Sequence, residues 1–143
     1  MIITSQTPSR LSLLGGGSDI LEFSQKYTGA VLSFAINLRQ NITLYTDDNL
    51  WGIENEIPTG VSPDFIHAIL TELGLGSYHH VRFKTEFDGV IGAGLGSSGA
   101  LGVSFVGIIN KFLNLGLTRS GIAEKAWDIE TNKFGHYGGK QDQ

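Results

Sequence analysis

The sequence has no cysteine, which excludes disulfide bonds and thiolate metal sites and weakly favours a reducing compartment. It also lacks an excess of positive charge: ten lysines and arginines stand against fourteen acidic residues, for a net charge of −4. The basic residues are scattered, so the electrostatic footprint of a nucleic-acid-binding protein is missing. We therefore expect a small-molecule partner. No basic leader precedes an apolar stretch at the start, so nothing marks export and the expected location is cytoplasmic.

A long uninterrupted hydrophobic run is lacking as well. Residues 89–110 carry no charge and are about long enough to cross a bilayer, but seven of them are glycine and three are serine. A loop that leads into a buried helix explains this composition better than a membrane span. With 143 residues, 41% hydrophobic content and no repeat or charged linker, the chain fits one domain over 1–143.

The apolar periodicity and the turn residues predict an α+β fold, in which a mixed sheet packs on helices in two layers. A turn is expected at 47–49. The expected strands cover residues 10–14, 30–38, 40–46, 51–54 and 81–87. The expected helices run from Ser18 or Asp19 to Tyr27, over 63–73, over 97–113, and from a Thr118 cap to Phe134, with Gly29, Gly74 and Gly135 as stops.

The loop over residues 92–99 is the densest glycine cluster in the chain. Its G-x-G-x-x-G spacing matches the dinucleotide pattern, but a second helix follows, and Arg119 lies near the place of the acidic ribose ligand. A P-loop would need a lysine after the last glycine, where Ala100 stands. No G-x-S-x-G nucleophile elbow passes through Ser97 or Ser98. The context therefore argues against all three motifs.

What the loop does offer is a set of small residues that expose successive N–H groups at the start of a buried helix, which is a site for phosphate. The hydroxyls of Ser97 and Ser98 add ligands for a phosphate or its magnesium ion. The alternative is that the glycines only let the loop pack closely against the sheet.

Glu130 is informative by position alone. On the expected helix it shares a face with Ile122, Ala126, Trp127 and Phe134, so it points inward, where an unpaired carboxylate is costly. A buried partner or a metal ion is implied, and a structural ion pair is the alternative.

Three segments together resemble the motifs of the GHMP kinase superfamily, which includes galactokinase, homoserine kinase, mevalonate kinase and phosphomevalonate kinase. Residues 94–98 read GLGSS, residues 8–19 read PSRLSLLGGGSD, and residues 138–143 read GGKQDQ. The triple glycine before Ser-Asp and the Gly-Lys-Gln-Asp-Gln ending are most similar to D-glycero-D-manno-heptose 7-phosphate kinases and fucokinase-like sugar kinases. One departure is Val90, where the family usually has proline.

The resemblance implies a GHMP kinase N-terminal domain over 1–143, with the ribosomal-protein-like domain 2 fold and its left-handed β-α-β crossover. It also implies that the family's C-terminal domain is absent from this chain. Galactokinase-like members carry Glu-His where Gly16 and Gly17 stand, which leaves room for a larger sugar.

The resemblance also implies a role for each matching residue. ATP would bind Gly92, Gly94, Leu95, Gly96, Ser97, Ser98 and Gly99, and Mg²⁺ would bind Ser98 and Glu130. The catalytic residues would be Asp142, facing the acceptor hydroxyl, and Arg10, stabilising the transferred phosphoryl group. The sugar would contact Asp19, Gly16, Gly17, Gly139 and Lys140.

Each of these assignments has a structural alternative: a solvated terminal carboxylate for Asp142, a surface arginine for Arg10 and a helix cap for Asp19. His79 and His80 are expected to be exposed and structural, because no companion ligand stands at metal spacing. His136 is near Asp142 in sequence and is expected to line the sugar site.

The predicted function is an ATP-dependent sugar kinase, a phosphotransferase that acts on the anomeric hydroxyl of a heptose 7-phosphate or related sugar. The alternative is a truncated nucleotide- or sugar-binding module without turnover, because a missing lobe would prevent closure around the substrates. A structural interaction domain is a third hypothesis. The expected partners are ATP and a sugar phosphate, without nucleic acid or membrane, and the formation of a homodimer stays open.

Overall fold

The structure is a computed structural model that describes residues 1–46, 52–54, 62–76, 81–135 and 138–143. A four-stranded sheet has the order β1-β2-β4-β3. Its strands are β1 (Ile2–Leu14), β2 (Leu32–Thr46), β3 (Gly52–Glu54) and β4 (Val81–Phe87). β2 pairs antiparallel with both β1 and β4, whereas β3 pairs parallel with β4, so the sheet is mixed as predicted.

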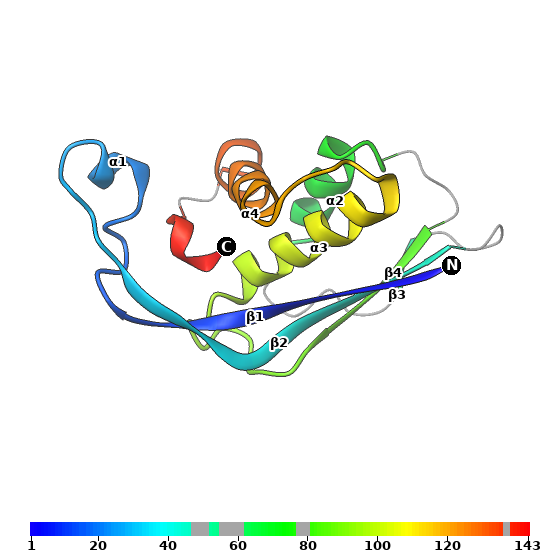
Figure 1. Ribbon diagram of the computed structural model, residues 1–143, viewed down its shortest axis with the longest axis horizontal. Helices are drawn as coiled ribbons and strands as arrows, with labels where there is room; N and C mark the ends of the chain where they lie inside the picture. Colours follow the sequence, from blue (N-terminus) through cyan, green and yellow to red (C-terminus); the bar gives the residue numbers. More distant parts are fainter. Residues whose placement is uncertain (47–51, 55–61, 77–80, 136–137) are drawn as a thin grey trace.

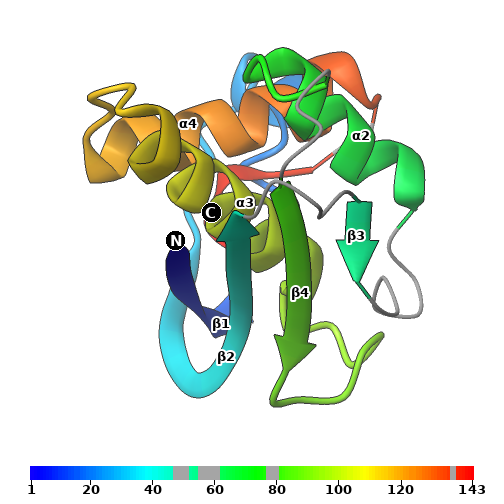
Figure 2. The ribbon, with the colours of Figure 1, turned by 90° about the vertical axis from the view of Figure 1, so that its right-hand side faces the viewer.

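The helices cover one face of this sheet, which gives the two predicted layers (Figure 1). They are α1 (Leu21–Ser24), α2 (Pro63–Glu72), α3 (Ser97–Leu113) and α4 (Arg119–Asp128). A π-helical turn (Ile129–Lys133) continues α4, and a 3-10 turn (Lys140–Asp142) follows near the end of the chain. Figure 2 shows β3 at the edge of the sheet beside β4, with α2 above it, so that β3, α2 and β4 form a β-α-β unit.

The core lies between the sheet and α3. Ile42 and Leu44 of β2 and Phe83 of β4 are almost completely buried, and the ring of Phe83 lies 5.3 Å from that of Phe105 on α3. α3 buries nine of its residues around most of its circumference, as its nearly continuous apolar sequence predicts. This burial fixes the position of the α3 N-terminus, where the glycine loop ends.

Four expected boundaries were wrong. β1 begins at Ile2 rather than at residue 10. The side chains of residues 2–9 alternate as in a strand, but those that face α3 are small and polar, so a search for alternating apolar residues does not detect this part of β1. Residues 30–38 and 40–46 form the single strand β2, which has a register shift against β1 between Pro8 and Arg10. The predicted helix up to Tyr27 is one turn, α1, and the predicted helix up to Phe134 leaves α-geometry after Asp128.

Other expectations were confirmed. α2 and α3 match their predicted ranges closely, and the side chains of Ser62 and Thr118 cap α2 and α4. Gly74 and Gly135 take positive φ values of 82° and 76° at the ends of helical segments. The expected turn at 47–49 lies outside the described residues. No helix in the described part of the chain has the length and apolar character that a membrane span requires.

Candidate active site

The glycine loop takes backbone conformations that explain its composition. Gly92, Gly94 and Gly96 have φ values of 81°, 71° and 68°, a region that side chains with a Cβ rarely adopt. Gly96 is the N-cap of α3 and no side chain caps this helix end. The first N–H groups of an α-helix have no intrahelical partner. The loop therefore delivers polar backbone groups to the positive end of a buried helix.

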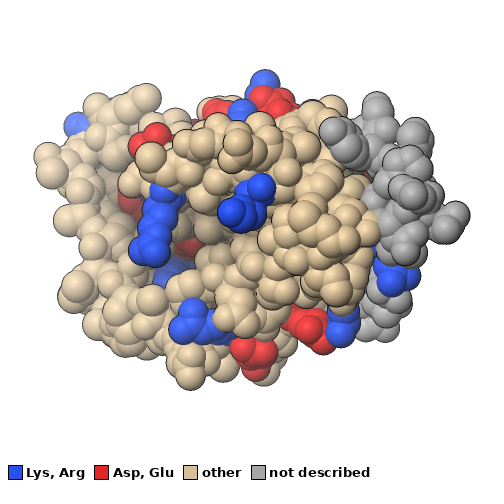
Figure 3. All heavy atoms as spheres, turned by 45° about the vertical axis from the view of Figure 1, so that its right-hand side comes forward, with Lys and Arg blue, Asp and Glu red and all other residues tan. Residues whose placement is uncertain are grey.

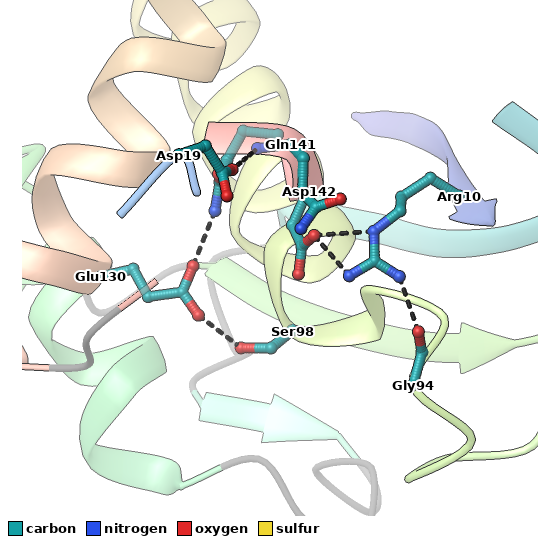
Figure 4. A network of polar contacts seen from close by, with 8 residues as sticks. Arg10, Asp19, Gly94, Ser98, Glu130, Gln141 and Asp142 are labelled. Carbon is teal, nitrogen blue, oxygen red and sulfur yellow. Dashed lines mark hydrogen bonds and ion pairs between the residues drawn. The ribbon is translucent and has the colours of Figure 1, made fainter. Parts of the chain in front are cut away.

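Arg10 and Asp142 meet beside this loop although they are 132 positions apart in the chain. Arg10 Nε donates to Asp142 Oδ1 at 2.7 Å, and Arg10 Nη2 lies 2.5 Å from the same oxygen. Arg10 Nη1 donates to the carbonyl oxygen of Gly94 at 2.6 Å, so one guanidinium joins the terminal turn to the glycine loop (Figure 4). The two side chains are 16% and 29% exposed, which leaves the pair open to a ligand.

Two glycines allow this close approach. A Cβ at Gly99 would lie 2.6 Å from Asp142 Cβ, and a Cβ at Gly96 would lie 3.2 Å from Arg10 Cζ. Any larger residue at Gly99 would push the Asp142 turn away from the first turn of α3. Asp142 is therefore held against the helix N-terminus and is not a solvated terminal carboxylate.

Glu130 points inward, as its helical position predicts, and is 9% exposed. Ser98 Oγ donates to its Oε1 at 2.9 Å, and Gln143 Nε2 donates to its Oε2 at 2.7 Å. A hydroxyl from α3 and a carboxylate from the π-helical turn thus lie together (Figure 4). These are the hard oxygen ligands that Mg²⁺ prefers when phosphates complete its coordination. No cluster of three acidic, histidine or cysteine residues that could hold a metal occurs among the described residues.

The turn that carries Asp142 is fixed from several sides. Trp127 Nε1 donates to the Gly138 carbonyl oxygen at 3.1 Å, and the Lys140 ammonium lies 4.5 Å from the centre of the Trp127 ring. The backbone N–H of Gln141 donates to Asp19 Oδ2 at 2.9 Å. Sequence reasoning missed Trp127 as a support for this turn, because the contact depends on how the chain folds back after α4.

The residues predicted to bind sugar surround the same turn. A Cβ at Gly139 would overlap the Asp19 carboxylate, and a Cβ at Gly16 would lie 3.5 Å from Gln141 Nε2. Gly17, with φ 89°, has open space around its Cα. Gln141 and Gln143 also join this cluster. Both stand in the Gly-Lys-Gln-Asp-Gln ending of the sequence, but only Gly139, Lys140 and Asp142 of that ending were predicted as site residues. His79, His80 and His136 lie outside the described residues.

A cleft of about 690 Å³ adjoins the Arg10–Asp142 pair. It extends along β1, whose residues 5–10 line one wall, while Gln141 and Gln143 contribute at the chain end. On the face shown in Figure 3, basic side chains are dispersed among acidic and neutral ones.

Comparison with known proteins agrees with this architecture. The family model for the GHMP kinases N terminal domain matches residues 64–143. The D-glycero-alpha-D-manno-heptose 7-phosphate kinase of Campylobacter jejuni is 32% identical over 167 aligned positions, which cover 99% of this chain and 47% of that protein. A crystal structure of a D-glycero-D-manno-heptose 1-phosphate kinase from Bacteriodes thetaiotaomicron has a TM-score of 0.82 at 26% identity, covering 100% of this chain and 52% of the other.

The galactokinase of Thermosipho africanus is 27% identical over 150 positions, covering 96% of this chain and 41% of the relative. The chain therefore belongs to the GHMP kinase family and has the fold of its N-terminal domain. It spans about half the length of the relatives that it matches.

Proposed function

We propose that this chain is the N-terminal part of an ATP-dependent sugar kinase that transfers the γ-phosphate to the anomeric hydroxyl of a heptose 7-phosphate or a related sugar. The observation that carries this proposal is the Arg10–Asp142 pair, held beside the N-terminus of α3, which no side chain caps. Phosphoryl transfer requires mainly positioning and charge neutralisation, and these residues supply both. The proposed compartment is the cytoplasm.

The nucleotide phosphates would lie in the loop formed by Gly92, Gly94, Leu95, Gly96, Ser97, Ser98 and Gly99. Backbone N–H groups at a helix N-terminus favour bound anions through hydrogen bonds and through the helix dipole. Ser98 and Glu130 would hold Mg²⁺ against these phosphates, because their oxygens already share one hydrogen bond. When bound, the ion would neutralise charge on the transferred group.

The acceptor hydroxyl would approach Asp142. Arg10 occupies Oδ1 of this carboxylate, which leaves Oδ2 to orient the hydroxyl or to accept its proton. The hydroxyl oxygen forms a bond to the γ-phosphorus while the bond from that phosphorus to the bridging oxygen of ADP breaks. The Arg10 guanidinium would stabilise the negative charge on the phosphoryl group during this step.

The sugar would contact Gly16, Gly17, Asp19, Gly139 and Lys140 on the other side of the terminal turn. The absence of side chains at Gly16 and Gly17 leaves space, and Lys140 places a positive charge near Trp127. A sugar that already carries a phosphate would benefit from this charge. Relatives named for heptose phosphates support this substrate class.

The test is a phosphoryl-transfer assay of the purified protein with magnesium-ATP and a panel of heptose 7-phosphate, fucose, galactose and mannose, followed by ³¹P NMR. We expect phosphorylation of a heptose phosphate, and we expect its loss in Asp142→Asn with no loss in the surface control Asp64→Asn. Nucleotide binding without transfer to any sugar would favour the binding module. No nucleotide binding, together with unchanged behaviour of Ser98→Ala, would favour an interaction domain.

A further inference from the structure

Asp19 is presented by a loop whose two ends are tied together. Ser18 Oγ donates to the Gly15 carbonyl oxygen at 2.7 Å, and the N–H of Ala30 donates to Ser18 Oγ at 3.1 Å. A Cβ at Gly15 or Gly29 would overlap a backbone carbonyl oxygen across this junction. The backbone therefore fixes where the Asp19 side chain starts, independently of any ligand.

The Asp19 carboxylate does not cap the helix that follows it. The N-cap of α1 is Ile20, and no side chain caps α1. Asp19 Oδ2 instead accepts the N–H of Gln141, the second residue of the 3-10 turn, and the carboxylate lies over Gly139. One oxygen of Asp19 thus serves as a cap for a turn that is 122 positions away in the chain.

This contact bears directly on Asp142, the next residue after Gln141. The turn contains only three residues, so a shift of the Gln141 amide moves the Asp142 backbone with it. On its other side Asp142 accepts a hydrogen bond from Arg10 and packs against Gly99, where a side chain would leave no room for it. The Asp142 carboxylate is therefore held between Arg10 on one side and the Asp19 contact on the other (Figure 4).

We propose that Asp19 is a positioning residue that aligns Asp142 through the Gln141 N–H group. This inference rests on the proposed kinase function and assigns Asp19 a role besides contact with sugar. Its second oxygen, Oδ1, is enclosed and has no hydrogen-bond partner in the described structure. An asparagine can keep an oxygen toward Gln141 and place its NH₂ group where Oδ1 lies, so Asp19→Asn preserves the contact that Asp19→Ala removes.

The first measurement is hydrogen exchange of the Gln141 amide by NMR, which needs no turnover. We expect exchange to accelerate by about tenfold or more in Asp19→Ala, because the amide loses its hydrogen-bond acceptor, and to recover in Asp19→Asn, which keeps an acceptor oxygen. Glu22→Ala is the matched control, since Glu22 lies three residues later on α1, is exposed, and has no described hydrogen bond to the turn. Unchanged exchange in Asp19→Ala would overturn the proposal.

The second measurement separates positioning from substrate binding. A positioning role predicts that Asp19→Ala lowers kcat at saturating sugar by about 10- to 100-fold, in addition to any rise in KM that follows from the lost sugar contact. Asp19→Asn should recover most of the lost kcat. A raised KM with unaltered kcat would overturn positioning and leave Asp19 as a sugar ligand. If the unsubstituted protein transfers no phosphate, the proposed function fails, while amide exchange still decides whether Asp19 holds the turn.

Discussion

Asp142 Oδ1 lies 2.7 Å from Arg10 Nε and 2.5 Å from Arg10 Nη2, while the third nitrogen of the same guanidinium donates to Gly94. Three nitrogens in one plane therefore bridge the terminal turn and the glycine loop. A lysine has one ammonium at a single point and cannot reproduce this geometry.

The first prediction is that Arg10→Lys keeps a positive charge but lowers kcat by about 100-fold or more, because Asp142 and the loop lose their shared partner. The measurement is steady-state kinetics with magnesium-ATP and the sugar. Arg39→Lys is the control, since Arg39 lines the cleft without a described side-chain hydrogen bond or ion pair. Equal kcat values for Arg10→Lys and the unsubstituted protein would contradict the role given to the guanidinium.

The second prediction concerns Gly99, the third residue of α3. In Gly99→Ala the added Cβ would lie 2.6 Å from Asp142 Cβ and 2.8 Å from its carbonyl oxygen, so the turn must move. We expect phosphoryl transfer to fall by about 100-fold, since small misplacements of a catalytic group have effects of this size. The melting temperature should change little, because alanine favours the helix.

Gly107→Ala is the matched control on the same helix. Its added Cβ would lie 3.5 Å from Ser5 Oγ, an ordinary contact, and alanine in a helix interior stabilises by about 0.5–1 kcal/mol. We expect normal transfer and a higher melting temperature. If both variants lost phosphoryl transfer, α3 would tolerate no side chain at either position, and the loss in Gly99→Ala could not be assigned to a displacement of Asp142.

The third prediction tests Glu130 as a magnesium ligand. In Glu130→Gln one of the two acceptor oxygens becomes an NH₂ donor, which faces either Ser98 Oγ or Gln143 Nε2, both of which donate in the native contact. We expect the Mg²⁺-dependent part of the ATP affinity to fall by about tenfold or more, and the affinity measured in EDTA to stay the same. Calorimetric titration with and without Mg²⁺ measures both.

Glu124→Gln on the exposed side of α4 is the control for Glu130→Gln. It should leave ATP binding with and without Mg²⁺ unaltered. If Glu130→Gln weakens ATP binding equally in EDTA, its carboxylate supports the fold of the site rather than the ion.

The elements that a local pattern encodes were predicted well. The apolar run over 97–113 gave α3, and the Ser62-Pro63 start gave α2 with its cap. The first half of β1 was missed because Ser5, Thr7 and Ser9 face α3 with small polar side chains, which hydrophobic alternation does not register. The helix expected up to Tyr27 is only the single turn α1, and Asp19, the expected cap, has its hydrogen bond to Gln141 instead.

The site depends on contacts between residues far apart in the chain, which the apolar periodicity of the sequence does not predict. Sequence motifs brought Arg10, Asp142 and Glu130 into one prediction. The two glutamines beside Asp142 belong to one of these motifs but were given no role, and Trp127 was missed, because the contacts of all three depend on the folded chain. The π-helical turn (Ile129–Lys133), which carries Glu130, is a further example, because nothing in the apolar pattern indicated that α-geometry ends after Asp128. Such turns often occur at functional positions.

The last prediction concerns the pH dependence of stability through Glu72 on α2. A hydrogen bond from Lys125, together with the charges of Lys125 and Lys133, holds the pKa of Glu72 below its ordinary value of 4.5. Lys125 Nζ lies 3.1 Å from Glu72 Oε1, and Lys133 Nζ lies 3.7 Å from Oε2, so the carboxylate links α2 to α4 and its π-helical turn.

Because the folded protein favours the ionised form of Glu72, this carboxylate adds to the free energy of unfolding. Its contribution is fully present above about pH 4.5 and is lost as the pH falls through the lowered pKa. Glu72→Gln should therefore melt slightly below the unsubstituted protein near neutral pH, and the difference should vanish in more acidic buffer. High salt should also shrink the difference, since these side chains are partly exposed. Thermal melts of both proteins across this pH range measure it, with Glu124→Gln as control. If the difference in melting temperature stayed constant through the acidic range, the glutamine would act by perturbing packing. Lys125 and Lys133 would then not stabilise the ionised form of Glu72.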